Sequence, residues 1–600
     1  MNKAMARRIS YVFLIVFILV TAVGQVYAVT PVVKSGITRL GGEDRYGTCI
    51  KVATAVANTH ENKKVDAVVV SSGTGYADAL SGSYLAARAN APIFIMNPKG
   101  SNTAVLEQIS KVLNKDGKIF VLGGTKAIPK AIERKLKGIS RNVERLGGDT
   151  RYDTNLLILD AGDNYEANTN ATDNSPASSS PDDSKQPAKE PAPTAPRDLL
   201  ICSGANYPDA LSASGTGKAI LLVDKGLTAE QKAYLKKNKN TFKNIYIIGG
   251  SVAVSEKVAN QVANYGLCKR IEGKDRYRTS IAVARNLYRS SQLQEVVLAS
   301  GENFPDGLVG GPLAYSKGCP LILTHNKSFI PTYQFLVKRA NIKAATILGG
   351  ASLISDDATG LTKGGAKKKG LLKVGNKLYY SYDDATFAKN KSQKIGGETY
   401  YFGSDCAAIK NGIIKEGNQY YYVTNGKKDS SVCKAVTQDG AEWNVINGIA
   451  TKVVTEKDKT QNRALKVIAR ITNDKMSKAE KLRACWDYSQ SFREFNPRIP
   501  HYTGLDWHIV YANDLFVRDG GNCMSFGAAF AFLARGLGYD NVYACNSGGH
   551  GWAEINGLVY DPEWAMHHFK YSYYGAPQTG TDQNYRGAIA AGAPWMRIKI

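Results

Sequence analysis

Three residues in the last fifth of the chain have types that together can perform nucleophilic chemistry: Cys523, His550 and Asp561. A thiolate is the reactive form of cysteine, and it needs a base to accept the proton of the thiol. A histidine can act as this base when a carboxylate holds one of its ring nitrogens. The three residues therefore predict attack of a thiol on a carbonyl group, provided that the fold brings them together.

A predicted helix positions the cysteine. After Cys523, apolar residues recur at the spacing of one helix face, at Phe526, Phe530, Leu533 and Leu537. The segment Gly520-Gly521-Asn522 supplies a turn and a cap before the helix. We expect Cys523 at the helix N-terminus, where the helix dipole favours a thiolate and backbone N–H groups can receive an oxyanion.

A predicted hairpin positions the histidine and the aspartate. Asn556-Gly557 lies between two strand-like runs and is a strong signal for a two-residue turn. This turn places Ile555 opposite Leu558 in the ladder. Counting outward, His550 and Asp561 lie on the same face as diagonal neighbours, within reach of each other.

Other interpretations of these residues remain open. A cysteine at a helix start is often a small buried residue, His550 can bond a loop, and an Asp561-Pro562 pair is common in turns. His567-His568 and Glu563 suggest a metal site, but an adjacent pair is poor ligand spacing, so we expect no metal and no cofactor. The nine cysteines show no CxxC pattern and do not form a disulfide scaffold.

The segments Gly521-x-Cys523, Gly548-Gly549-His550-Gly551-Trp552 and Tyr560-Asp561-Pro562 resemble the bacterial transglutaminase-like family. The resemblance covers residues 460–570. It implies a papain-like α+β fold for residues 440–600, with Cys523 as nucleophile, His550 as general base and then acid, and Asp561 as the orienting acid. It implies acyl transfer through a thioester, to an amine in a crosslinking enzyme or to water in a peptidase. Asn522 and Trp507 are candidates for the additional oxyanion donor.

The first two-thirds of the chain contain a threefold repeat. Each copy begins with an Arg-Leu-Gly-Gly-like block that ends in Arg-Tyr. It continues with a Ser-Gly block that ends in an aromatic-x-Asp-x-Leu pattern, and it closes with Gly-Gly. The first blocks start at Arg39, Arg145 and Arg270, the Ser-Gly blocks at Ser72, Ser203 and Ser300, and the closing glycines at Gly123, Gly249 and Gly349.

Short apolar runs between these blocks predict the fold of each repeat. Examples are residues 67–70, 245–248 and 296–298, which are bounded by glycines and alternate with helical patterns. Such runs are typical of buried parallel strands, so each repeat is expected to be a three-layer α/β unit. No GxGxxG or Walker motif is present, and the glycines are expected to make tight turns rather than a nucleotide site.

These repeats resemble the cell wall-binding repeat 2 family over residues 39–358. The resemblance implies three units, at 39–140, 145–265 and 270–358, packed as a pseudo-threefold module that binds an anionic wall polymer without a covalent bond. Arg45, Arg151 and Arg276 are candidate polymer ligands because guanidinium groups suit phosphate and carboxylate. A structural salt bridge within each repeat is the alternative interpretation of the same arginines.

Two further segments concern export and surface exposure. Residues 1–28 combine basic residues, an apolar run and a Val26-Tyr27-Ala28 cleavage signal, which is typical of a signal peptide. The apolar run is short for a bilayer, so we expect a secreted Gram-positive surface protein whose mature chain has no transmembrane segment. The insertion at 163–196 is rich in Pro, Ser, Asp, Ala and Thr, and we expect a disordered loop.

A shorter repeat follows in residues 366–435. Gly375, Gly396 and Gly417 recur every 21 residues, and each is followed by tyrosines. The pattern predicts successive β-hairpins of a solenoid, and it resembles the choline-binding type of wall repeat, whose stacked aromatics grip a ligand. The ligand candidates are Tyr379, Tyr400 and Tyr421. A tyrosine core and a rigid basic spacer are the alternatives.

The formal charge of +25 favours a polyanionic environment, and a generally soluble basic surface is the alternative interpretation. With an export signal, the expected partner is an anionic wall polymer rather than nucleic acid. The sequence thus favours a wall-anchored cysteine enzyme acting on surface peptides or proteins. The competing hypothesis is a structural or adhesive surface protein whose C-terminal domain binds without catalysis.

Overall fold

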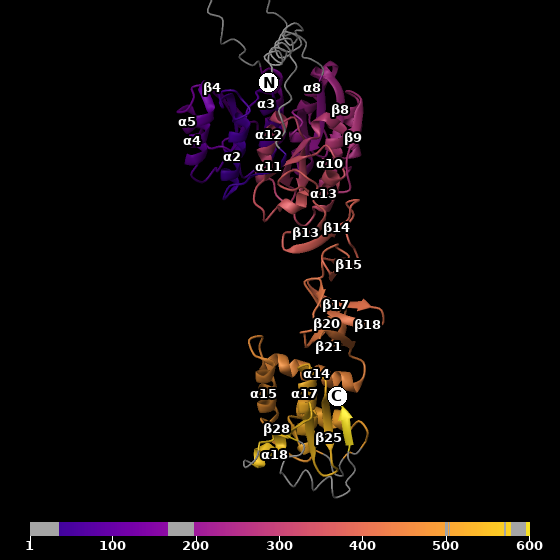
Figure 1. Ribbon diagram of the computed structural model, residues 1–600. Coiled ribbons are helices and arrows are strands. Elements are labelled where there is room, and N and C mark those ends of the chain that lie inside the picture. The colour runs from indigo at the N-terminus through magenta and orange to yellow at the C-terminus, as the bar shows by residue number, and fades with distance from the viewer. Residues whose placement is uncertain (1–34, 166–196, 498–501, 503, 569–571, 578–595) are drawn as a thin grey trace, which may run out of the picture. The chain divides into compact units, whose positions relative to one another are not determined.

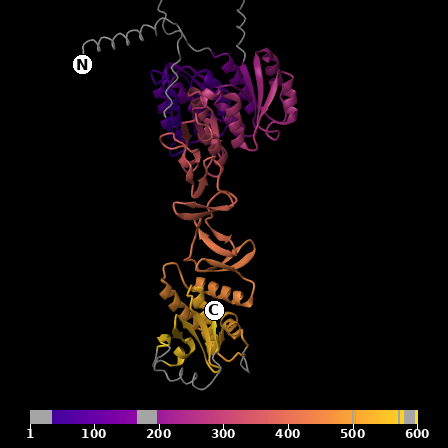
Figure 2. The same ribbon diagram turned by 45° about the vertical axis from the view of Figure 1, so that its right-hand side comes forward.

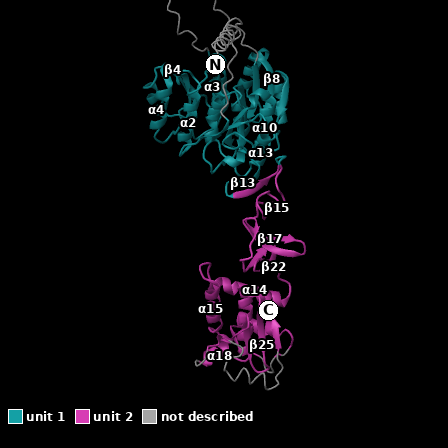
Figure 3. Ribbon diagram, viewed as in Figure 1, with its two compact units in different colours: residues 1–376, 383–385 teal, residues 377–382, 386–600 magenta. Residues whose placement is uncertain are grey.

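The computed structural model describes residues 35–165, 197–497, 502, 504–568, 572–577 and 596–600. The chain divides into two compact units (Figure 3), the first formed by residues 1–376 and 383–385 and the second by residues 377–382 and 386–600. The expected signal peptide and residues 166–196 of the expected insertion lie outside the described residues. Among the described residues, no helix has the length and apolarity needed to cross a membrane.

The first unit contains three four-stranded sheets with the same strand arrangement (Figure 1). In spatial order they are β3 (Ile93–Met96), β2 (Val65–Ser72), β4 (Leu113–Leu122) and β5 (Val143–Leu146); β7 (Ala219–Val223), β6 (Arg197–Ser203), β8 (Phe242–Ile248) and β9 (Cys268–Ile271); and β11 (Leu321–Thr324), β10 (Glu295–Ser300), β12 (Ala344–Leu348) and β1 (Gly36–Leu40). All neighbouring strands are parallel, and the central strands are buried. The predicted parallel α/β repeats are therefore confirmed.

The sheets are offset by one strand from the repeats in the sequence. The strand of each Arg-Leu-Gly-Gly block pairs with the sheet of the preceding repeat, as β5 does with β4 and β9 with β8. The first such strand, β1, pairs with β12 of the third repeat. A repeat that begins at residue 39, 145 or 270 thus gives its first strand to the preceding sheet, and the exchange closes a ring.

Helices surround the sheets and join the repeats (Figure 2). The first helix of each repeat is α2 (Arg45–Ala57), α6 (Arg151–Asp163) or α10 (Arg276–Leu287), and the second is α3 (Ala77–Arg88), α7 (Pro208–Ser214) or the pair α11 (Pro305–Leu308) and α12 (Gly310–Ser316). Helices α3, α7 and α12 contact one another, and each packs on the first helix of the next repeat. The outer helices are α4 (Thr103–Val112), α5 (Lys130–Lys137), α8 (Ala229–Lys237), α9 (Glu256–Ala263) and α13 (Ile330–Val337), and three 3₁₀ turns lie at Lys239–Thr241, Ser290–Gln292 and Asp356–Thr359.

The closing glycines pack against the aspartate of the Ser-Gly block. Gly249 has a φ of +105°, and a Cβ there would lie 2.3 Å from Oδ2 of Asp209. Gly123 and Gly349 have the same relation to Asp78 and Asp306. Because only glycine adopts this φ without a side-chain clash, the second and third blocks of each repeat depend on each other.

Successive hairpins follow the third repeat, as predicted. They are β13 (Gly370–Val374) with β14 (Lys377–Ser381), within which the boundary between the units falls, and β15 (Lys391–Ile395) with β16 (Glu398–Phe402). The next hairpin, β17 (Asn411–Glu416) and β18 (Gln419–Thr424), joins β19 (Lys427–Lys428), β20 (Lys434–Gln438), β21 (Ala441–Ile446) and β22 (Ile449–Lys452) in a six-stranded sheet. The hairpin module thus runs past residue 435, the expected boundary, because β20–β22 continue the sheet without the Gly-Tyr signature.

The C-terminal part of the second unit has an α+β arrangement. Its helices are α14 (Glu456–Ile471), α15 (Lys478–Ser489), α16 (Trp507–Arg518), α17 (Cys523–Gly536) and α18 (Pro562–His567). Its antiparallel sheet has the order β28 (Tyr574–Pro577), β27 (Leu558–Tyr560), β26 (Gly551–Ile555), β25 (Val542–Asn546) and β29 (Met596–Lys599), and the short strands β23 (Arg493–Glu494) and β24 (Gly520–Gly521) pair separately.

Helix α17 is the central element of this part. It packs against α14, α15 and α16 and against strands β25 and β26. Every residue from Met524 to Ala534 is buried. The single apolar face predicted from the sequence is therefore too narrow a description, because neighbours cover the helix on all sides.

Candidate functional site

Cys523 is the first residue of α17, as predicted. The Asn522 side chain caps the helix and accepts a hydrogen bond from the Ser525 N–H at 3.3 Å. A Cβ on Gly521 would lie 2.3 Å from the Ser525 Cβ, so the glycine allows the tight entry into the helix. Cys523 itself is partly exposed, and its thiol lies 3.9 Å from the Gly549 carbonyl oxygen, beside the start of β26. The thiol is thus held at a helix N-terminus and remains accessible.

The hairpin that carries His550 and Asp561 has the predicted register. Asn556 and Gly557 have φ values of 51° and 85°, as a type I′ turn requires, and Ile555 pairs with Leu558. Asp561 follows the second strand and caps α18, where it accepts from the Trp564 N–H at 3.1 Å. Its other oxygen lies 2.5 Å from Nε2 of His550. The carboxylate, which is fully buried, therefore holds one imidazole nitrogen in place.

The surroundings of His550 favour its charged form. Burial disfavours the imidazolium, but hydrogen bonds to Asp561 and Cys523 outweigh this effect and raise the pKa of His550 to about 10. The Trp564 ring lies 4.8 Å from the imidazole and the Trp552 ring 6.3 Å, so aromatic side chains shield it from water. A thiol hydrogen-bonded to such an imidazole can transfer its proton and attack a carbonyl carbon.

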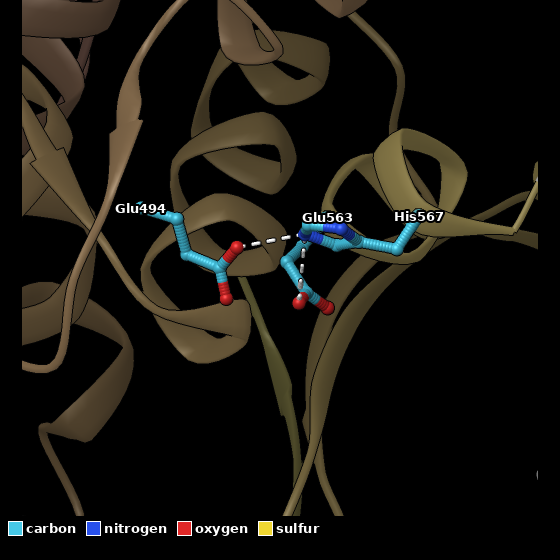
Figure 4. Close-up of side chains that lie close together, drawn as sticks. All are labelled: Glu494, Glu563 and His567. Carbon is cyan, nitrogen blue, oxygen red and sulfur yellow. Dashed lines mark hydrogen bonds and ion pairs between the residues drawn. The ribbon is translucent and has the colours of Figure 1, made fainter.

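A second cluster of ionisable groups adjoins this site (Figure 4). His567 Nε2 lies 2.7 Å from Glu494 and 3.9 Å from Glu563, whose other oxygen lies 3.9 Å from Nδ1 of His550. Burial, followed by the charge of Asp561, raises the pKa of Glu563 to about 7, against the opposing effect of His550. Ligand atoms of Glu494, Glu563 and His567 all lie within 4.8 Å of one another, a spacing that can hold a divalent cation.

Glu494 was not among the residues expected from the sequence. It lies on β23, 73 residues before His567, and no local pattern links the two. The expectation of no metal considered His567-His568 as an adjacent pair, whereas His568 faces the Trp564 ring at 5.1 Å. Only a long-range contact between β23 and α18 brings the three residues together.

The two candidates for an additional oxyanion donor, Asn522 and Trp507, lie in a helix cap and in the core. The side-chain oxygen of Asn522 caps α17, and its amide lies 3.5 Å from Asn496. Trp507 is fully buried at the start of α16, and its Nε1 has no hydrogen-bond partner among the described residues. Neither contact links these side chains to the thiol.

The candidate polymer ligands of the first unit occupy equivalent positions. Their guanidinium groups donate to the carbonyl oxygen of the glycine in the Ser-Gly block of the same repeat. The distances are 2.8 Å for Arg45 to Gly73, 2.6 Å for Arg151 to Gly204 and 2.5 Å for Arg276 to Gly301. These arginines therefore join the first and second blocks of a repeat, as the structural interpretation requires, although their partner is a carbonyl oxygen. Their contact with polymer stays a prediction.

An aromatic triangle and three half-buried carboxylates, those of Asp78, Asp209 and Asp306, lie where the repeats meet. The rings of Tyr76, Tyr207 and Phe304 lie 5.5–5.8 Å apart in pairs. The Tyr76 hydroxyl accepts from Arg151 at 3.0 Å, and that of Tyr207 from Arg276 at 3.3 Å. The sequence contained this signal, because an aromatic residue recurs two positions before the Asp of each Ser-Gly block, but its role requires the threefold packing.

The three hairpin tyrosines are not equivalent. Tyr379 is buried and packs edge-on against Phe387 at 6.3 Å. Tyr400 and Tyr421 are half-buried, and lysine ammonium groups lie over their rings, Lys427 at 4.9 Å and Lys428 at 3.5 Å. Tyr379 thus fits the core alternative, while the other two rings already hold a cation from the chain itself.

Comparison with known proteins identifies the first unit. Residues 39–133, 145–259 and 270–359 match the model of cell wall binding domain 2 (CWB2). The chain is 23% identical over 330 residues to N-acetylmuramoyl-L-alanine amidase LytC of Bacillus subtilis. This alignment covers 54% of this chain and 58% of the amidase. It is 26% identical over 321 residues to the amidase enhancer of Bacillus subtilis, covering 53% of this chain and 39% of the enhancer.

The chain therefore spans about half the length of the curated relatives that it matches. Among solved structures, Cwp6 from Clostridium difficile aligns with a TM-score of 0.45 and 21% identity, over 56% of this chain and 49% of Cwp6. The three segments matched by the family model make up half of the 600 residues. The chain therefore belongs to the cell wall binding domain 2 family, whose domains bind cell wall polymers.

Proposed function

We propose that this chain is a secreted, wall-anchored thiol enzyme that transfers acyl groups from amide bonds of surface peptides or proteins. The CWB2 repeats supply the attachment to the wall. The C-terminal part supplies the chemistry, through Cys523, His550 and Asp561. The observation that carries the proposal is the position of the Cys523 thiol, 3.9 Å from the carbonyl oxygen of the residue before His550, together with the buried carboxylate that holds the imidazole.

The reaction begins with transfer of the Cys523 proton to His550. The thiolate sulfur then forms a bond to the amide carbonyl carbon, and the carbonyl oxygen becomes an oxyanion. The first N–H groups of α17, which have no partner within the helix, are the proposed oxyanion donors. Asp561 keeps Nε2 engaged, so Nδ1 is the nitrogen that serves the thiol.

The tetrahedral intermediate then collapses. The C–N bond breaks, the leaving amine takes the proton from His550, and a thioester remains on Cys523. In the second half, His550 accepts a proton from an incoming amine or water, which attacks the thioester and releases the thiolate. An amine acceptor gives a crosslinked product, whereas water gives hydrolysis.

The test is the rate of iodoacetamide alkylation of the full chain across pH, with labelled cysteines mapped by mass spectrometry. Cys523 is expected to react below about pH 7, where an ordinary thiol is mostly protonated. Cys406 is the matched reference, because it is also partly exposed and burial raises its pKa. His550→Ala is expected to abolish the fast reaction of Cys523 and leave Cys406 unchanged.

Equal rates at Cys523 and Cys406 would refute the enzyme proposal and leave a C-terminal binding module. A positive result justifies an acceptor assay, with a glutamine-containing protein and a fluorescent primary amine. Amine incorporation indicates a crosslinking enzyme. Release of ammonia without incorporation indicates transfer to water.

We also propose that the wall polymer bound by the repeats is anionic. The formal charge of +25 supports this choice, because a strongly basic protein at a surface is attracted to phosphate- or carboxylate-bearing polymers. The test is sedimentation with purified Gram-positive wall before and after acid extraction of its anionic polymer. Binding is expected to be lost on extraction, and undiminished binding would contradict the proposal.

A further inference from the structure

The third repeat contains a basic groove between α10 and the end of α13. The groove has a volume of about 660 Å³ and is lined by Arg278, Arg285, Asn286, Phe335, Lys338 and Arg339, among others. Glu272 is the acidic side chain in the lining, against four cationic ones. The groove is therefore strongly positive, and its volume suits a ligand larger than a single ion.

Two guanidinium groups share one aromatic ring in this groove. The Cζ atoms of Arg285 and Arg339 lie 5.6 Å and 4.7 Å from the centre of the buried Phe335 ring. Burial and then the positive charge of Arg285 lower the pKa of Arg339. The ring orients both planar guanidinium groups. The charge that acts on Arg339 is that of Arg285, so the two groups repel each other.

The other two repeats show that the fold does not require this arrangement. The residue nine positions after the helix start is Thr54 in α2, Asp160 in α6 and Arg285 in α10. Thr54 accepts a hydrogen bond from Gln108 on α4 at 2.9 Å, and Asp160 pairs with Lys237 on α8 at 3.5 Å. The same place between two helices is thus neutral in one repeat, compensated in the second and doubly cationic in the third.

The residue two positions after the helix start follows the same trend. It is Gly47 in α2, Asp153 in α6 and Arg278 in α10. Arg278 pairs with Asp275 at the helix start, so part of its charge is compensated within the chain. Repulsion between uncompensated cations costs stability, and a repeat that keeps them without a structural need indicates an anionic ligand.

We propose that this groove is the polymer-contact site of the first unit and that Arg285 and Arg339 bind phosphate or carboxylate groups of the wall polymer. The inference rests on the proposed attachment to an anionic polymer and assigns it to the third repeat. Guanidinium forks match the geometry of both oxoanions, and Phe335 holds the two forks at the groove. The Asn286 amide and the Lys338 ammonium group supply further donors at its rim.

The experiment compares the full chain with the double variant Arg285→Gln/Arg339→Gln. The matched control is Lys232→Gln/Lys236→Gln, which removes two charges from exposed positions of α8 in the second repeat. Binding is measured to intact wall, to acid-extracted wall, and to polyphosphate and polygalacturonate as soluble probes. Far-UV circular dichroism melts verify that each variant is folded.

The arginine variant is expected to bind intact wall and at least one soluble probe about tenfold or more weaker, since a hydrogen bond to a charged group contributes this much or more. The control variant is expected to change less than threefold. The two soluble probes decide whether phosphate or carboxylate is the recognised group. An equal loss in both variants would show general attraction to a basic surface and would overturn the groove assignment.

The two proposals fail in different ways. If the wild-type chain binds extracted wall as well as intact wall, the anionic-polymer proposal is wrong. If extraction removes wild-type binding but the arginine variant still binds intact wall like the wild type, the polymer proposal stands and the groove is wrong.

Discussion

The pH dependence of the first unit tests how the repeats are joined. Asp209 lies in the second repeat and faces Arg276 and Thr279 of the third. Burial raises the pKa of its carboxyl group to about 6, against the opposing effects of the Arg276 charge and the hydrogen bond to Thr279. The folded state therefore favours the protonated carboxyl group more than the unfolded state does.

The sign follows from linkage. A carboxyl group whose pKa is raised on folding contributes stability below its unfolded pKa, and this contribution is lost as the pH rises through the folded pKa. With an unfolded value of 3.8 and a folded value of about 6, the loss between pH 4 and pH 8 is about 2–3 kcal/mol. Asp78 and Asp306 have raised pKa values for the same principal reason, so the whole ring shares the trend.

The assay compares urea unfolding of the wild type and Asp209→Asn at pH 4 and pH 8. All six tryptophans lie in the second unit, so a transition seen by circular dichroism but not by tryptophan fluorescence belongs to the first unit. The quantity compared is the unfolding free energy of the wild type minus that of the variant. This difference is expected to fall by about 2–3 kcal/mol between pH 4 and pH 8. A difference between the two proteins that does not change with pH would refute this account of the interface.

Three further predictions concern other parts of the chain. Gly249→Ala is expected to destabilise the first unit by about 1–3 kcal/mol, because the residue has a φ of +105° and its Cβ would meet Asp209, and a thermal melt measures this. Burial lowers the pKa of His508 to about 4, so the unfolding free energy of the second unit is expected to fall by about 2 kcal/mol between pH 7 and pH 4.5. His508→Phe is expected to remove this pH dependence in urea unfolding followed by tryptophan fluorescence. The chain is expected to pass unretained through a choline column, because Lys428 covers the Tyr421 ring where a choline cation would bind, and specific elution with free choline would contradict this.

The candidate site was predictable to the extent that its signals are local. A two-residue Asn-Gly turn allows one register, so the approach of His550 and Asp561 follows from counting residues. The start of α17 is equally local, because Asn522 caps the helix one residue before Cys523. Glu494 has no such signal, since it reaches the site through a strand pair that depends on tertiary packing.

The fold too was predictable from local signals and not where it depends on tertiary contacts. Buried apolar runs identified the parallel strands, but not which sheet each strand joins. Strand β1 has five residues and only one of them is buried, so its own pattern carries little information about its partner. The sheet beyond residue 435 was missed for a related reason. Its turns contain Gly440 and Gly448, but no tyrosines follow them and the 21-residue spacing of the earlier hairpins is not kept.

The exchange of first strands explains how a linear chain closes a threefold ring. The contacts between the first and second repeats and between the second and third each include a tyrosine hydroxyl bonded to an arginine, whereas the third repeat has Phe304 in this place. At this junction strand β1 completes the third sheet, and its Arg39 side chain bonds the Gly349 and Ile354 carbonyl oxygens and Asp356, as the equivalent strands and arginines do at the other two junctions. The first arginine of each first block (Arg39, Arg145 or Arg270) thus donates to the carbonyl oxygen of the closing glycine of the preceding repeat and acts as a clamp between the two. Since this clamp recurs in all three repeats while the arginine pair of the groove occurs in one, the clamp belongs to the fold and the groove is where recognition of the polymer is to be sought.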